Sequence, residues 1–157
     1  MTNSIEQRLA ELGIELPSAA APVANYTPFV ISGNLVFISG QGPMGPKGLE
    51  YTGKCGAGID IETAQKAARL TALNVLAQLR AACGGDLGRV RRCVRIEGFV
   101  NATSDFTQHP AVINGASDVI VAILGPIGVH ARYAVGVDSL PFGMTVEIAA
   151  IFDIEPV

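Results

Sequence analysis

The chain has 157 residues, of which 49% are hydrophobic and 16% charged, and its formal net charge is −3. This length fits one domain with a core large enough to fold without disulfides or a metal. We therefore expect a single domain over residues 1–157, in which residues 1–21 form an N-terminal helix and loop extension. The apolar content is high for a free monomer and predicts subunit interfaces, since obligate oligomers bury more apolar surface.

Charge and cysteine content exclude several classes of protein. A net negative charge gives no attraction to nucleic acid or to an anionic membrane. We find no run of about 18 apolar residues, the length that a membrane span needs. The three separated cysteines, Cys55, Cys83 and Cys93, suit a reducing compartment, so we expect a cytoplasmic protein. His109 and His130 are too isolated, and the cysteines too far apart, to predict a metal site.

The first part of the chain predicts one short helix and one hairpin. Apolar residues at helical spacing predict a helix over 4–12. Two β-rich runs, 29–31 and 34–39, are separated by Ser32-Gly33 and predict a hairpin. Residues 40–58 are rich in glycine and proline and predict a long loop.

The second part predicts two long helices and three strands. Asp60 can cap a helix that runs to about Cys83, and a second helix starts near Pro110 and ends at Gly125. Residues 90–101 alternate as a half-buried strand, and two further strands follow the second helix. This order predicts an α+β fold, with a mixed β-sheet and both helices packed on one of its faces.

The last two strands carry one arginine and one glutamate among apolar residues, Arg132 and Glu147. Alternation predicts that Tyr133, Val135 and Val137 face the helices and that Arg132 faces away from them, beside small residues. If these strands pair, Arg132 and Glu147 lie close together. Two interpretations stay open: a structural ion pair, or a site in which the guanidinium binds a carboxylate and the glutamate transfers a proton.

Three other patterns are weaker. Three spaced glycines at Gly40, Gly42 and Gly45 match a dinucleotide-binding pattern, but no helix opens after them, so we do not predict such a site. Four arginines between 89 and 95 occur without aromatic neighbours, which favours a solvated strand edge over an RNA site. Asn114 lies beside a glycine in the second helix, and both residue types are poor helix formers. The pair marks either a turn at which the backbone approaches another group, or an unfavourable pair that the helix tolerates.

Several short motifs occur together in a characteristic order. They are the run GNLVFISGQ at 33–41, Asn114, Ala131-Arg132, Leu140-Pro141 and the run VEI at 146–148. Over about residues 22–154 the chain therefore resembles the Rid family, the reactive intermediate deaminases, also called YjgF-type or L-PSP proteins. The resemblance implies a chorismate-mutase-like fold and a homotrimer with ligand clefts between subunits. It also implies hydrolysis of 2-imino acids, tautomers of enamines such as 2-aminoacrylate, to 2-oxo acids and ammonia without a cofactor.

The resemblance also implies roles for individual residues. Arg132 would bind the substrate carboxylate and Glu147 would activate the attacking water. The substrate-binding residues would be Ser39, Gly40, Asn114, Phe29 and His130, of which Phe29 and His130 replace the usual tyrosine and proline. Two alternatives stay open: a trimeric sensor that binds a small carboxylate without turnover, and an endoribonuclease, after an older label of the family.

Overall fold

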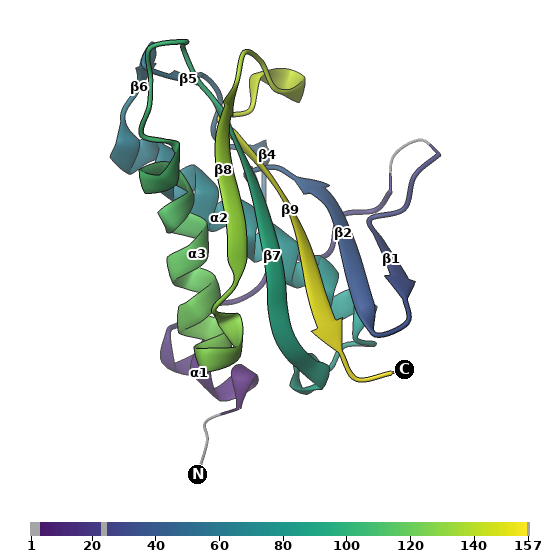
Figure 1. Cartoon of the computed structure of the whole chain (residues 1–157). Helices are drawn as coiled ribbons and strands as arrows, with labels where there is room; N and C mark the ends of the chain where they lie inside the picture. The colour runs from purple at the N-terminus through teal and green to yellow at the C-terminus, as the bar shows by residue number, and fades with distance from the viewer. Residues whose placement is uncertain (1–3, 23–24, 157) are drawn as a thin grey trace.

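A computed structural model describes residues 4–22 and 25–156. A five-stranded sheet has the order β1-β2-β9-β7-β8, and the long helices α2 and α3 lie together on one of its faces (Figure 1). β7 and β8 are parallel and the other neighbouring pairs are antiparallel. The strands are β1 (Phe29–Ser32), β2 (Leu35–Gln41), β7 (Val90–Asn101), β8 (Ala131–Val137) and β9 (Val146–Ile154). The predicted α+β class, mixed sheet and one-sided helices are confirmed.

The helices begin and end close to where their capping residues predict. α1 (Ile5–Glu11) has a capping box formed by Ser4 and Gln7. At the start of α2 (Ile61–Ala82), the Asp60 carboxylate accepts a hydrogen bond of 2.7 Å from the Thr63 amide. α3 (His109–Leu124) carries a proline in its first turn. Short 3-10 turns cover Leu87–Arg89, Gly125–Gly128 and Pro141–Gly143.

The core lies between the sheet and the two long helices. In β9 every second residue, from Val146 to Ile154, is buried against the helices. The segment His109–Gly128 is long and apolar enough to cross a membrane by length and composition, which corrects the expectation that no such segment exists. Seven residues of α3 are buried, as in the core helix of a folded domain: Val112, Ile113, Ala116, Val119, Ile120, Ile123 and Leu124.

The opposite face of the sheet is not covered by any element among the described residues. It exposes Val30, Phe37, Tyr133 and Val135. The predicted orientation of β8 is therefore wrong, because Tyr133 and Val135 lie on this open face while Ala134 packs against the core. We call this surface the open face below.

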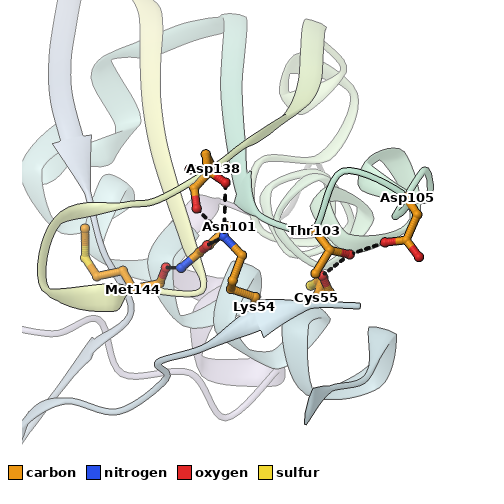
Figure 2. A network of polar contacts seen from close by, with 7 residues as sticks. All are labelled: Lys54, Cys55, Asn101, Thr103, Asp105, Asp138 and Met144. Atoms are coloured by element: carbon orange, nitrogen blue, oxygen red, sulfur yellow. Dashed lines mark hydrogen bonds and ion pairs between the residues drawn. The ribbon is translucent and has the colours of Figure 1, made fainter. Parts of the chain in front are cut away.

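The segment between β2 and α2, predicted as a plain loop, contains two small pairs of strands. They are β3 (Met44–Gly45) with β4 (Gly48–Leu49), and β5 (Lys54–Cys55) with β6 (Gly58–Ile59). Figure 2 shows how Lys54 ties this segment to the strand ends. Its ammonium donates to Asn101 Oδ1 at 3.0 Å and to the Asp138 carbonyl. Asn101, in turn, donates to the Met144 carbonyl at 3.1 Å, so one buried amide at the end of β7 contacts both this segment and the connection between β8 and β9.

Candidate functional site

Arg132 lies at the edge of the sheet, on the face that carries the helices. Across the sheet it is in register with Ile96, and Ile96 is in register with Ala150. Both of these neighbours are buried in the core. Since residues in one cross-strand row share a face, the Arg132 side chain points toward α3. This reverses the predicted orientation, in which Arg132 faced away from the helices.

The guanidinium of Arg132 contacts one edge of α3. Nη1 donates to the Ser117 hydroxyl at 3.0 Å, and Nη2 donates to the Pro110 carbonyl at 3.3 Å. His130 reaches the same hydroxyl, with Nε2 2.9 Å from Ser117 Oγ. Asn114 is exposed and lies three or four residues from both Ser117 and Pro110, so it belongs to the same edge of the helix. The structure thus groups Arg132, His130 and Asn114.

Glu147 lies on the open face, on the central part of the sheet. It is in register with Phe99 and packs against Gly40, where an added methyl carbon would lie 2.5 Å from Glu147 Oε1. The carboxyl is half-buried, and burial raises its pKa above the usual range of a glutamate. No hydrogen bond or ion pair engages it within residues 4–22 and 25–156.

The two charged residues do not meet within one chain. β7 separates β8 from β9, so the two strands are not neighbours, and the predicted lateral approach is wrong. Arg132 and Glu147 are two strands apart laterally and three residues apart along β7, which places their Cα atoms about 14 Å apart. Their side chains also point to opposite faces. A structural ion pair between them within the chain is therefore excluded.

The remaining predicted residues divide between the two groups. Gly40 adjoins Glu147, and Ser39 precedes it at an irregularity in the pairing of β2 with β9. The Ser39 hydroxyl donates to the Thr27 carbonyl at 2.8 Å. Phe29 is half-buried and packs against the core rather than beside Glu147. Two half-sites result: Glu147 with Gly40 and Ser39, and Arg132 with His130 and Asn114.

Ser117 was not predicted, although it contacts both His130 and Arg132. A serine at this position of an amphipathic helix gives little signal in sequence; its spacing of three residues from Asn114 is the one clue that points to the same edge.

The environment of the cysteines does not favour reactive thiols. All three are buried, and burial raises the pKa of each thiol, for Cys93 to about 12. No cluster of potential metal ligands occurs in the described part of the chain.

The fold and the two half-sites define a class of protein: a chorismate-mutase-like α+β domain with one sheet face uncovered. Residues 6–151 match the family described as "YjgF/chorismate_mutase-like, putative endoribonuclease", and the chain belongs to this family. The family predicted from the sequence motifs is thereby confirmed.

Individual relatives extend over nearly the whole chain. Protein TCP17 of Trypanosoma cruzi is 46% identical over 151 residues, which cover 96% of this chain and 94% of that protein. The crystal structure of Atu1372 from Agrobacterium tumefaciens, a protein of unknown function, is 50% identical with a TM-score of 0.90, covering 96% of this chain and 92% of that one. A putative endoribonuclease from Shewanella oneidensis MR-1 is 35% identical with a TM-score of 0.92, covering 97% and 100%.

A more distant structure contains a small ligand. TdcF of Escherichia coli, solved with bound serine, is 26% identical with a TM-score of 0.59, covering 88% of this chain and 94% of that one. A small molecule that carries a carboxylate therefore binds at least one protein of this fold.

Proposed function

We propose that this protein is an imine deaminase, which hydrolyses 2-imino acids to 2-oxo acids and ammonia in clefts between copies of the chain. The observation that supports it is the pair of half-sites. Arg132 has no carboxylate partner among the described residues, and Glu147 has no cationic one. Each half-site therefore lacks the charge that a second copy, or a charged substrate, would supply.

The open face supports the assembly on which this proposal depends. It exposes apolar side chains over strands β1, β2 and β8, and such a surface is typical of an interface between subunits. Arg132 lies on the edge strand β8, so it can extend from one copy toward the open face of the next, where Glu147 and Gly40 lie. We propose a homotrimer, the assembly that the family resemblance implies, in which three copies related by one rotation form three equivalent clefts.

The chemistry follows from the two side chains. The Arg132 guanidinium binds the substrate carboxylate through two parallel hydrogen bonds. Glu147 accepts a proton from water as the water oxygen bonds to C2, and the electron pair of the C=N bond moves to nitrogen. Glu147 then returns the proton to nitrogen, which gives the tetrahedral amino alcohol. Glu147 next takes the hydroxyl proton and passes it to nitrogen as the C–N bond breaks, so that ammonia leaves and the 2-oxo group forms. Because burial raises the pKa of Glu147, it is a stronger base than an exposed glutamate.

The bound serine of TdcF is consistent with a carboxylate ligand for this fold, since serine carries a carboxylate next to a nitrogen-bearing carbon. Serine is not an imine, so it supports the ligand class and not the reaction. The imine itself is electrophilic at C2, and the proposed reaction needs only water as co-reactant.

The proposal is tested by ammonia release from freshly generated 2-aminoacrylate. We expect turnover by the wild type, and loss of it in both Arg132→Ala and Glu147→Gln. Co-expression of these two inactive variants is the sharper test. If the cleft lies between subunits, a Glu147→Gln copy supplies Arg132 and an Arg132→Ala copy supplies Glu147, so random mixing restores about a quarter of the sites. Activity that stays absent in the mixed trimers contradicts a shared cleft, and no turnover by the wild type on several imino acids contradicts the enzyme.

The sensor alternative shares Arg132 but does not need Glu147. Affinity for pyruvate and turnover are therefore measured together in Glu147→Gln. Unchanged affinity with lost turnover supports the enzyme, whereas a wild type that binds pyruvate and turns over no imine supports the sensor.

The endoribonuclease alternative would need a basic surface that binds RNA. Two of the clustered arginines, Arg91 and Arg95, lie within 4.0 Å of the acidic partners Glu155 and Glu97, so the surface offers little support for it.

A further inference from the structure

We propose that Ser117 and His130 are positioning residues that hold the Arg132 guanidinium ready for a carboxylate ligand. The inference deepens the proposed function and rests on its assignment of Arg132 as the carboxylate-binding group. It is carried by a continuous chain of hydrogen bonds. The chain runs from the Gly128 carbonyl through the His130 ring and the Ser117 hydroxyl to Arg132 Nη1.

When the His130 ring is neutral, the partners at the two ends determine the direction of every hydrogen bond in this chain. His130 Nδ1 lies 2.6 Å from the Gly128 carbonyl oxygen, which can only accept, so Nδ1 carries a proton. In the neutral ring Nε2 then has a free lone pair and accepts the hydroxyl proton of Ser117 at 2.9 Å. With its proton directed to His130, the Ser117 oxygen presents lone pairs to Arg132, whose Nη1 donates at 3.0 Å.

Three elements contribute to this arrangement. Ser117 is on α3, Gly128 belongs to the 3-10 turn that follows α3, and His130 and Arg132 flank Ala131 at the start of β8. The short connection between α3 and β8 therefore places the ring and the guanidinium on the same hydroxyl. Ser117, His130 and Arg132 are all only partly exposed, so water competes less for these bonds than on an open surface.

The arrangement fixes the arginine and still leaves it free to bind. A guanidinium has five N–H donors. Two of them are engaged, one by Ser117 and one by the Pro110 carbonyl, so three remain for a ligand as far as the described residues show. A free arginine side chain loses much rotamer entropy when it binds, and a guanidinium already held in place loses less. Ser117 and His130 should therefore act on ligand affinity more than on the chemical step.

The first test measures the Kd of pyruvate and the kinetics with 2-aminoacrylate. Ser117→Ala should raise Kd and KM about tenfold with kcat nearly unchanged, because a hydrogen bond to a charged group is lost. Ser117→Thr retains the hydroxyl and should restore the affinity. In an Arg132→Ala background, Ser117→Ala should have no further effect on Kd. His130→Gln should raise Kd in the same direction as Ser117→Ala, because it removes the ring that orients the Ser117 hydroxyl. His109→Gln is its control and should leave Kd unchanged, since His109 packs on Phe106 rather than on Ser117.

The second test does not depend on activity. Nitrogen-15 NMR of the neutral His130 ring should show a protonated Nδ1 and an unprotonated Nε2, and Ser117→Ala should increase the mobility of the Arg132 Nε–H group. The opposite tautomer, or a Ser117→Ala variant with unchanged pyruvate affinity, overturns the inference. So does an Arg132→Ala variant that binds pyruvate as tightly as the wild type. If the expected NMR and binding results appear without any turnover, the deaminase proposal fails while the positioning role stands.

Discussion

Replacing Gly40 with alanine should displace the carboxyl of Glu147 and little else. An added Cβ would lie 2.5 Å from Glu147 Oε1, whereas ordinary van der Waals contact begins near 3.4 Å. The difference requires the carboxyl to move by about 0.9 Å, and misplacement of a reacting group by about 1 Å lowers a rate by about 100-fold. Gly40 does not have a positive φ, so alanine can adopt its backbone conformation. We therefore expect Gly40→Ala to lower kcat about 10- to 100-fold.

The assay compares kcat on 2-aminoacrylate with pyruvate affinity and melting temperature. Affinity and melting temperature should change little, because the displaced atoms are the end of a flexible side chain. Gly45→Ala is a stringent control: its Cβ also meets a glutamate carboxyl, that of Glu50, and overlaps it more than the Cβ at Gly40 overlaps Glu147, but Glu50 belongs to neither half-site. If a crystal structure of Gly40→Ala shows the carboxyl displaced while kcat is unchanged, Glu147 does not transfer the proton from this position.

Four further predictions concern stability and assembly. Gly115→Ala should lower the free energy of unfolding by about 1–3 kcal/mol in urea denaturation, because its Cβ would overlap the Gln65 carbonyl where α2 and α3 meet. Arg8→Ala should cost about 1–2 kcal/mol, since Arg8 donates to carbonyls in the last turn of α3; an unchanged urea midpoint would contradict this. A raised pKa of Glu147 means that the folded chain retains a proton that the unfolded chain releases, so its contribution to stability falls as pH rises through that window. Glu147→Gln should thus raise Tm at neutral pH and leave it unchanged in acid. Val135→Glu, on the open face, should dissociate the oligomer in light scattering.

The sequence predicts the helices well because their ends carry local signals. Asp60 accepts from a backbone amide at the start of α2, and Pro110 lies in the first turn of α3, as their residue types indicate. The family motifs likewise identify Gly40 and Glu147, which do adjoin each other. Both kinds of signal depend on residues that are near each other in the sequence or that recur in a fixed order.

The orientation of β8 could not be obtained in this way. Alternation separates Arg132 and Ala134 from Tyr133 and Val135, but it does not say which set the helices cover. The more apolar set of a strand normally faces the core. In β8 the more apolar set, which contains Tyr133 and Val135, lies on the open face, and that face also exposes the apolar side chains of β1 and β2. The insertion of β7 between β8 and β9 is a long-range pairing without a local signal. The same holds for the contact of Ser117 with His130, which joins a helix to a strand.

The hydrogen bonds of Lys54 to the ends of β7 and β8 also bear on how the segment between β2 and α2 separates from the sheet. Beyond the ammonium contacts, the Gly53 amide donates to the Gly143 carbonyl at 2.9 Å, and the Thr145 amide donates to the Tyr51 carbonyl at 3.2 Å. These bonds and the Lys54 network break together when the segment lifts away. The amides of residues 51–55 and 143–145 should therefore exchange with deuterium as one cooperative unit. Since Glu147 follows this unit by two residues, opening there would increase the exposure of its half-buried carboxyl to solvent before the rest of the sheet unfolds.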